Sequence, residues 1–167
     1  LGVMASSYIF ARVHKIPFWH LQDLTTFGGA IGFFFGRIAN FINGELYGRE
    51  APAGLTWAVK FPQEMLVWGN ADLEKTRALG PAVSALKEIP THSGLLQVNA
   101  ETWNQWVSAY ASSGGASELI RQAKESLIHA VQTGRTDIVM LLEPVLTPRY
   151  PSQLIQSVLE GLLVAIV

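Results

Sequence analysis

The chain has 167 residues, a formal net charge of −1 and no cysteine, and 15% of its residues are charged. The absence of a basic block argues against a nucleic-acid partner, and the absence of cysteine excludes disulfides and thiolate metal sites. A charged fraction below the roughly 25% of typical soluble domains, together with a mean hydropathy of +0.25, favours a membrane protein. Apolar residues are concentrated in 1–11, 24–42 and 154–167, which predicts an all-α, polytopic membrane protein that carries a polar insert.

Three segments are candidates for membrane-spanning helices, each of which needs about 20 mainly apolar residues. Residues 1–11 are interpreted as the last part of one span, 21–44 as a complete span and 151–167 as the first part of a third. Leu1 is not a start methionine, and Val167 falls within an apolar run. The chain is therefore interpreted as an internal fragment with one complete and two partial transmembrane helices.

The short loop 12–20 sets the predicted orientation. It carries Arg12, His14 and Lys15, and basic residues in short loops mark the cytoplasmic side of a membrane. The next span then runs outward. Residues 45–150 are accordingly predicted to form an extracytoplasmic insert.

Hydrophobic periodicity predicts that this insert is mostly helical. Ser117 is the expected cap and Gly134 the expected stop of its clearest helix, and Pro81 interrupts a weaker one. The run SSGG is expected to be a loop. The predicted helices cover 117–132, 102–111 and 72–86, the loop covers 112–115, and a short extended segment lies in 56–62.

Arg37 is the residue that points most directly to a function. A charge at membrane depth is costly unless it is paired or wetted, so it indicates a functional site. The planar guanidinium makes bidentate bonds to phosphate oxygens, and Asn40 and Asn43 add neutral donors. Arg37, Phe41 and Glu45 recur at intervals of four, so Arg37 and Glu45 are expected on one side of a helix or close across a loop. The pattern predicts a lipid-headgroup site.

Glycines near this arginine have two interpretations. Gly28 and Gly32 are expected to form a ridge where another helix packs closely, and Gly44 and Gly48 let backbone approach a headgroup.

Arg37 itself can alternatively form a structural ion pair or reach to lipid headgroups. A transporter or channel in which Arg37 and Glu45 line the path is an alternative function, and the insert can alternatively be a module that binds the substrate or a partner.

The arginine lies in a segment that resembles the signature of the prolipoprotein diacylglyceryl transferases. Residues 36–48, called the signature segment below, read GRIANFINGELYG. The family's signature reads G-R-x-[GA]-N-F-x-N-x-E-x-x-G, and every specified position matches. The matching residues are Gly36, Arg37, Ala39, Asn40, Phe41, Asn43, Glu45 and Gly48.

Two further segments are similar to the same family. Residues 57–62 (WAVKFP) resemble its W-A-V-x-F-P, and 148–154 (PRYPSQL) resemble its P-R-H-P-S-Q-L. Tyr150 replaces the family's histidine, which removes a group that titrates near neutral pH. Ile155 and Gln156 stand where tyrosine and glutamate are usual.

The resemblance implies a multi-pass enzyme of the bacterial inner membrane. It implies transfer of the diacylglyceryl group of phosphatidylglycerol to the lipobox cysteine thiol of prolipoproteins, with phosphatidylglycerol, prolipoprotein signal peptides and membrane lipid as partners. No metal or organic cofactor is implied, and the fragment by itself is expected to be inactive. The implied catalytic residues are Arg37, Asn40 and Glu45, and the implied phosphatidylglycerol-binding residues are Arg37, Asn43, Gly36, Gly48 and Glu160.

Overall fold

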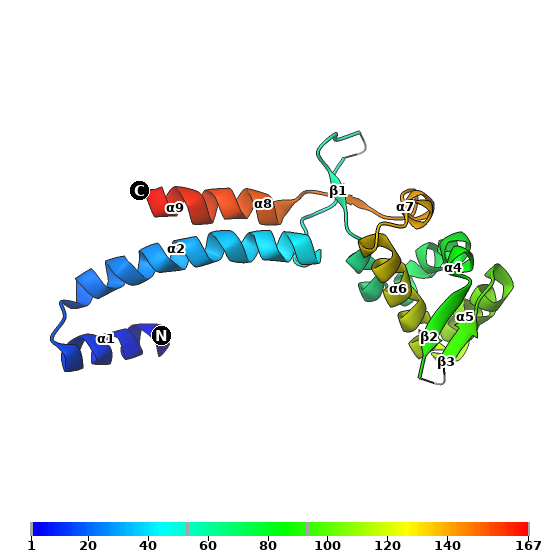
Figure 1. Cartoon of the computed structure of the whole chain (residues 1–167), viewed down its shortest axis with the longest axis horizontal. Helices are drawn as coiled ribbons and strands as arrows, with labels where there is room; N and C mark the ends of the chain where they lie inside the picture. The colour runs from blue at the N-terminus through cyan, green and yellow to red at the C-terminus, as the bar shows by residue number, and fades with distance from the viewer. Residues whose placement is uncertain (1, 53, 93, 167) are drawn as a thin grey trace. The chain divides into compact units, whose positions relative to one another are not determined.

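The computed structural model describes residues 2–52, 54–92 and 94–166, most of which are helical (Figure 1). The chain divides into two compact units. Unit 1 comprises the chain up to Arg49 and from Pro151 onward, and unit 2 is Glu50–Tyr150.

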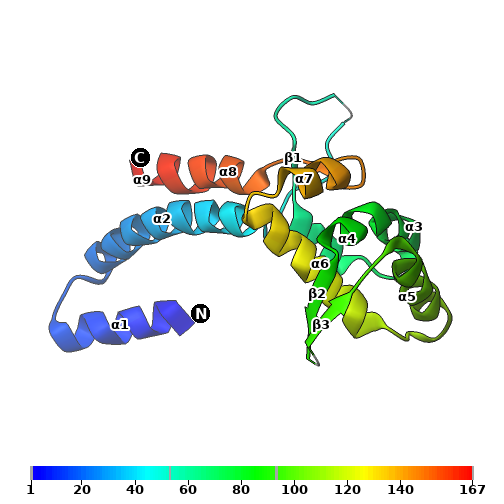
Figure 2. The same cartoon turned by 45° about the vertical axis from the view of Figure 1, so that its right-hand side comes forward.

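Unit 1 is built from helices that lie side by side. Helix α1 (Gly2–His14) packs against α2 (Phe18–Asn43). The C-terminal segment is one continuous run of helix that packs along α2 and runs antiparallel to it (Figures 1 and 2). This run comprises α8 (Ser152–Gln156), the π-helical η3 (Ser157–Leu162) and α9 (Leu163–Ile166).

The loop predicted at 12–20 is shorter in the structure. Helix α1 continues to His14 and α2 begins at Phe18. Pro17, with φ −59° and ψ 123°, directly precedes α2, and proline favours this position because a missing N–H costs nothing at a helix start. The helix therefore begins three residues before the predicted start at 21.

The segment 21–44, predicted as a complete span, ends one residue beyond α2. Among the described residues, no helix is both long enough and apolar enough to cross a membrane.

The closest approach between helices in unit 1 is at Gly161. A Cβ atom placed on Gly161 of η3 would lie 2.7 Å from both the Cα and the Cβ of Phe34 in α2. The predicted glycine ridge has no packing partner among the described residues, because a Cβ on Gly28 or Gly32 would meet nothing within 4 Å. The small residue that permits close packing is therefore on the C-terminal segment.

A two-stranded stem joins the two ends of unit 2. Strand β1 (Val59–Lys60) pairs antiparallel with β4 (Pro148–Arg149), with Val59 opposite Arg149. Glu50 forms a further β-bridge with Arg149. The two ends of unit 2 are thus held together by backbone pairing.

The remainder of unit 2 encloses a hydrophobic core of its own. Its centre includes Trp103, whose Nε1 donates to the carbonyl of Thr76 at 3.0 Å, and the fully buried Leu127 and Ile138. Helix α6 contacts most of the surrounding elements. The elements are η1 (Pro62–Val67), η2 (Asn70–Asp72), α3 (Leu73–Ala78), α4 (Gly80–Leu86), the antiparallel pair β2 (Glu88–Thr91) and β3 (Gly94–Gln97), α5 (Ala100–Ser113), α6 (Ser117–Gln132) and α7 (Thr136–Leu142).

Two predicted helices of the insert are present as single helices, and the third is present as two. Helix α6 has the predicted bounds, but Ala116, at φ 58°, precedes it instead of a capping Ser117. Helix α5 begins two residues before the prediction because Asn99 caps it by accepting from the N–H of Thr102. The third prediction divides into α3 and α4 just before Pro81, as the predicted interruption implies. Pro81 lies in the first turn of α4, a position that proline favours.

Other boundaries and elements differ from the predictions. The loop expected at 112–115 begins later, because α5 continues to Ser113 and Gly114 ends it at φ 70°. The predicted extended segment 56–62 contains only the two-residue strand β1. The sequence did not predict the pair β2 and β3, or helix α7.

Glu64 connects η1 to the stem of unit 2. Its carboxylate is 0% exposed, and both oxygens accept hydrogen bonds. Oε1 accepts from the backbone N–H of Thr147 at 2.7 Å, and Oε2 accepts from Nε of Arg149 at 2.7 Å. The buried carboxylate is therefore fully compensated by a charge and a backbone donor.

Candidate functional site

The signature segment is half helix and half loop, because Gly44 ends α2. Gly44 adopts φ 70° and ψ 28°, a left-handed conformation that glycine adopts without steric cost. Its N–H donates to the carbonyl of Phe41 at 3.1 Å, and the N–H of Glu45 donates to the carbonyl of Asn40 at 2.9 Å. These two bonds are the Schellman ending of a helix. Of the two arrangements predicted for Arg37 and Glu45, the shared helix side is therefore wrong.

Arg37 lies on α2, six residues before its end. The guanidinium Cζ is 4.6 Å from the ring centroid of Phe33, one helical turn earlier. Its Nε is buried and has no hydrogen-bond partner among the described residues. A buried donor left without an acceptor costs about 1–3 kcal/mol. No bond or ion pair joins Arg37 to Glu45 among the described residues.

The loop after α2 is held from α8. Gln153 is 0% exposed, and its Nε2 donates to the carbonyl of Glu45 at 2.6 Å. Ser152 Oγ donates to the carbonyl of Leu46 at 3.3 Å. The signature segment and residues 151–154 are more than one hundred residues apart in the sequence, and the structure brings them together inside unit 1.

The other predicted site residues occupy different surroundings. Asn40 is half-buried on α2, and its carbonyl accepts from Glu45. Asn43 is the exposed last residue of α2, and the side chain of Glu45 is also exposed. Glu160 is exposed on η3, and within the described chain no hydrogen bond or ion pair joins it to the signature segment.

Two glycines were also predicted to bind the headgroup. A Cβ on Gly36 would meet nothing within 4 Å among the described residues, so the backbone there is open to approach. Gly48 is half-buried in the loop that follows α2. Both are placed on the same stretch of chain as Arg37.

The remaining motif segments form the stem of unit 2. Residues 57–62 contain β1, and 148–150 contain β4. The ring of Trp57 lies 5.3 Å, centroid to centroid, from Tyr150, the residue that replaces the family's histidine. These segments therefore have a clear structural role in unit 2.

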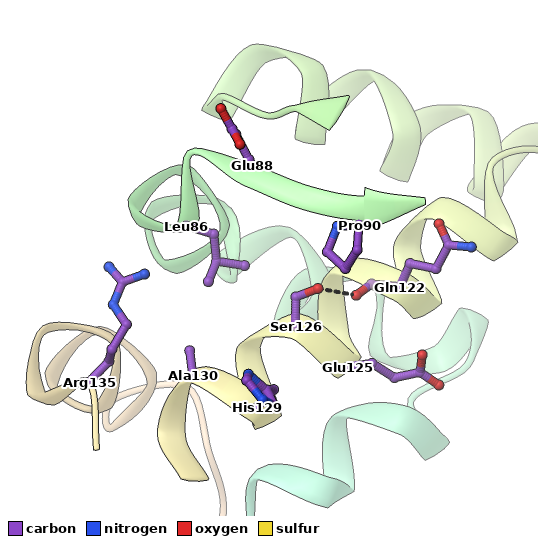
Figure 3. A pocket seen from close by; sticks show the side chains of 9 residues that line it. All are labelled: Leu86, Glu88, Pro90, Gln122, Glu125, Ser126, His129, Ala130 and Arg135. Carbon is purple, nitrogen blue, oxygen red and sulfur yellow. Dashed lines mark hydrogen bonds between the residues drawn. The ribbon is translucent and has the colours of Figure 1, made fainter. Parts of the chain in front are cut away.

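A pocket of about 510 Å³ lies between β2 and the C-terminal half of α6 (Figure 3). Two of its polar side chains have partners within the protein, whereas Oε1 of Gln122 is buried without a hydrogen-bond partner among the described residues. Ser126 Oγ donates to the carbonyl of Gln122 at 2.8 Å. Arg135 pairs with Asp137 at 2.6 Å and donates to the carbonyl of Ala85 at 3.0 Å.

The ion pair of Arg135 and Asp137 beside the pocket shifts the pKa of both side chains. The hydrogen bond from Arg135 lowers the pKa of Asp137, and the same bond raises the pKa of Arg135. Within the described residues, no group of three or more His, Asp or Glu side chains is placed to hold a metal ion. The arrangement indicates a structural role for these side chains.

Sequence reasoning did not identify Gln153 as part of the site. The polar residue stands in a largely apolar C-terminal segment, and buried polar side chains need hydrogen-bond partners. That contrast was the available signal, but its partner, the carbonyl of Glu45, is distant in sequence.

Comparisons with known proteins agree with the signature. A family described as prolipoprotein diacylglyceryl transferase matches residues 1–167. A phosphatidylglycerol–prolipoprotein diacylglyceryl transferase of Bdellovibrio bacteriovorus is 36% identical over 164 residues, which are 98% of this chain and 44% of the relative. That match includes nearly all of unit 2. No solved structure matches the chain.

Two relatives with the same description match less of the chain. The protein of Nitrobacter hamburgensis is 32% identical over 128 residues, 76% of this chain and 44% of the relative. The protein of Nitrobacter winogradskyi is 52% identical over 62 residues, 37% of this chain and 21% of the relative. The chain spans less than half the length of these relatives. The family matches residues 1–167, the whole of this chain, and the chain therefore belongs to the prolipoprotein diacylglyceryl transferase family.

Proposed function

We propose that the protein transfers the diacylglyceryl group of phosphatidylglycerol to the cysteine thiol of a prolipoprotein lipobox. The observation that carries this proposal is the buried Nε of Arg37 in the signature segment, which has no hydrogen-bond partner in the part of the chain that the structure describes. An arginine with free donors is suited to a phosphodiester. The relatives' shared description names phosphatidylglycerol and a prolipoprotein as substrates.

The reaction exchanges one bond to carbon for another. The sulfur of the lipobox cysteine forms a bond to the terminal glyceryl carbon, and the bond from that carbon to the phosphate oxygen breaks. Glycerol phosphate leaves with the electron pair, and the thiol proton passes to a base. Because the leaving group is a phosphate, a guanidinium that binds its oxygens stabilises the charge that develops in the transition state.

Arg37 is the proposed phosphate-binding residue, and its position on a helix supports this role. Phe33 lies against the guanidinium and restricts its plane. Asn40 and Glu45 are proposed to shape the site. Asn43 at the end of α2 is proposed as a further donor to the headgroup.

The glycines and the second acidic residue have smaller proposed roles. Gly36 and Gly48 are proposed to let the headgroup approach the backbone. Glu160 is proposed as a further headgroup residue from η3, which packs against α2. No metal or organic cofactor has a role in this scheme.

We also propose a multi-pass location in the bacterial inner membrane, with residues 45–150 outside the cytoplasm. Unit 1 supports this location because large apolar side chains are exposed on several of its helices, and exposed apolar surface indicates contact with lipid or another apolar partner. The proposed partners are phosphatidylglycerol, other membrane lipid and prolipoprotein signal peptides. Strongly exposed examples are Val3, Trp19, Leu24, Ile42 and Ile166.

The test uses the full-length protein in phosphatidylglycerol vesicles with a lipobox peptide. Mass spectrometry of the peptide should show the added diacylglyceryl group. Arg37→Ala should lower kcat by about 10²–10³-fold, the range for losing one donor to a developing anion. Arg37→Lys should recover only part of the rate because it keeps the charge without the planar fork.

Arg121→Ala is the matched control, because Arg121 pairs with Glu118 and Glu125 on the exposed side of α6 in unit 2. Its turnover should equal that of the wild type. Normal turnover by Arg37→Ala would remove Arg37 from the site. Solute flux through vesicles without any lipid transfer would favour the transporter alternative.

A further inference from the structure

Gln153 is a fully buried polar side chain of which only one end has a partner. It is the second residue of α8 and is 0% exposed. Its Nε2 donates to the carbonyl of Glu45 at 2.6 Å, whereas its Oε1 is buried and finds no hydrogen-bond partner in residues 2–52, 54–92 and 94–166. Buried amide oxygens are ordinarily satisfied. A residue chosen only to fill this space would not need that oxygen.

The orientation of the amide is fixed by its partner. Reversing the side chain would place Oε1 against the carbonyl oxygen of Glu45, where the nitrogen now lies at 2.6 Å. Two acceptors at that distance repel each other, since neither carries a hydrogen. The nitrogen must therefore face Glu45, and the acceptor without a partner is Oε1.

The residue that receives this bond belongs to the signature segment. Glu45 follows the Schellman ending of α2, and its carbonyl is outside the helix. The neighbouring bond from Ser152 to the carbonyl of Leu46 is longer, at 3.3 Å. Gln153 is accordingly the shorter and more buried of the two side-chain links between α8 and this loop.

We propose that Gln153 is a positioning residue of the transferase site, a role that rests on the function proposed above. Its amide nitrogen holds the loop 44–48, and its Oε1 accepts a hydrogen bond from a donor of the substrate. Arg37 lies six residues before the end of α2, about 9 Å along the helix axis, and offers an unpartnered donor. Unit 1 therefore presents one buried donor and one buried acceptor near the same helix end.

A phosphoglycerol headgroup matches this pair of groups. Its phosphate oxygens accept hydrogen bonds, and its glycerol hydroxyls donate them. A peptide N–H of the lipobox is a second source of a donor to Oε1. The two sources are distinguished by which KM changes when Gln153 is replaced, the KM for the lipid or the KM for the peptide.

The test measures diacylglyceryl transfer by the full-length protein, with phosphatidylglycerol vesicles and a lipobox peptide varied separately. Gln153→Met keeps the length of the side chain but removes both polar atoms. We expect kcat/KM to fall about tenfold or more, the effect of losing at least one hydrogen bond of about 1.4 kcal/mol. The fall should be accompanied by a raised KM for one of the two substrates.

Gln153→Glu separates positioning from packing through its pH dependence. As a neutral acid, the new side chain donates its O–H to the carbonyl of Glu45 and keeps one acceptor. As a carboxylate it has acceptors only, and it repels that carbonyl. The activity of Gln153→Glu relative to wild type should therefore rise as the pH falls, while the relative activity of Gln153→Met stays constant.

Gln105→Met is the matched control, because Gln105 is exposed on α5 of unit 2. It should transfer at the wild-type rate. Wild-type kcat/KM in both Gln153 variants would overturn this inference while leaving the proposed function intact, whereas no transfer by the wild type would overturn the proposed function itself. If Gln153→Met does not fold, a pH-independent activity ratio for Gln153→Glu would still overturn the inference.

Discussion

Replacing Glu64 by alanine should remove a large part of the stability of unit 2. The carboxylate is 0% exposed and binds both Nε of Arg149 and the N–H of Thr147, each at 2.7 Å. Arg149 is in the stem strand β4, so one side chain connects η1 to the segment that closes the unit. Alanine would remove the buried acceptor that binds Nε of Arg149 and the backbone N–H of Thr147.

The magnitude follows from the type of pair that is broken. Removing one partner of a buried ion pair costs about 3–5 kcal/mol, against a total stability of about 5–15 kcal/mol for a domain. Glu64→Ala should therefore bring unit 2 close to unfolding. Glu64→Gln keeps the volume of the side chain and one acceptor, so it should lower the free energy of unfolding by less than Glu64→Ala does. Its NH₂ group then faces one of the two donors, so it should still be less stable than the wild type.

The assay uses residues 50–150 as a separate chain. We expect this segment to fold alone, because it encloses its own core and Glu50 is bridged to Arg149. Urea unfolding followed by circular dichroism gives the midpoint. A loss of about 4 kcal/mol, with a slope of about 2 kcal/mol/M, lowers the midpoint by about 2 M.

The matched control is Glu74→Ala on α3. The side chain of Glu74 is 91% exposed and meets Arg77 at 3.5 Å, a surface pair that contributes little. Its urea midpoint should equal that of the wild type. A midpoint for Glu64→Ala within about 0.5 M of wild type would show that this buried pair does not hold the stem, and the reasoning would be refuted.

Two further substitutions test packing and charge. Gly161→Ala should destabilise the full-length protein by about 1–3 kcal/mol, because the new Cβ would lie 2.7 Å from the backbone of Phe34. The rate of thermal inactivation measures this loss. Gly28→Ala is the control, because its Cβ position is open, and it should not lower stability. The pKa of Lys124 is lowered by burial, with Asp72 opposing that effect, so the folded state binds this proton less strongly than the unfolded state does. Wild-type stability relative to Lys124→Met should therefore rise from neutral pH toward the usual lysine pKa near 10.4, and a difference in urea midpoint that is constant with pH would contradict this.

The helices of unit 2 were predictable where local signals agreed. The apolar spacing of 117–132 and the following Gly134 predicted the bounds of α6, since a helix of this length has a strong period and a clear stop. Lys124 lies on its buried side and contacts Trp68. The burial of Lys124 depends on its contact with Trp68, which is distant in the sequence. The hydrophobic spacing within 117–132 does not contain this contact.

The short elements of unit 2 were not predictable for a different reason. Strand β2 contains Pro90, which ordinarily argues against a strand, and its outer neighbours Leu95 and Leu96 on β3 are both exposed. The pattern therefore lacks the alternation of a half-buried sheet. Strand β2 exists because it packs on α6, a contact between distant parts of the sequence.

The candidate site shows the same division between local and distant information. Arg37 was identified from its own chemistry, because a charge in an apolar segment requires a reason. Gln153 was not, because its significance depends on a carbonyl 108 residues away. The four-residue spacing of Arg37, Phe41 and Glu45 predicted one shared side of a helix. This prediction was wrong because α2 ends before Glu45.

Gly44 explains why that spacing has no helical meaning. Its left-handed conformation ends α2 after Asn43, so Arg37 is carried by the helix while Glu45 is carried by the loop. The helix fixes Arg37 through its own backbone bonds, but the loop is linked to α8 through Gln153 and Ser152. The placement of Arg37 relative to Glu45 therefore depends on the packing of the C-terminal segment along α2. Gly161 permits that packing because it has no Cβ to meet Phe34, so a residue outside the signature segment contributes to how α2 and the loop after it are held.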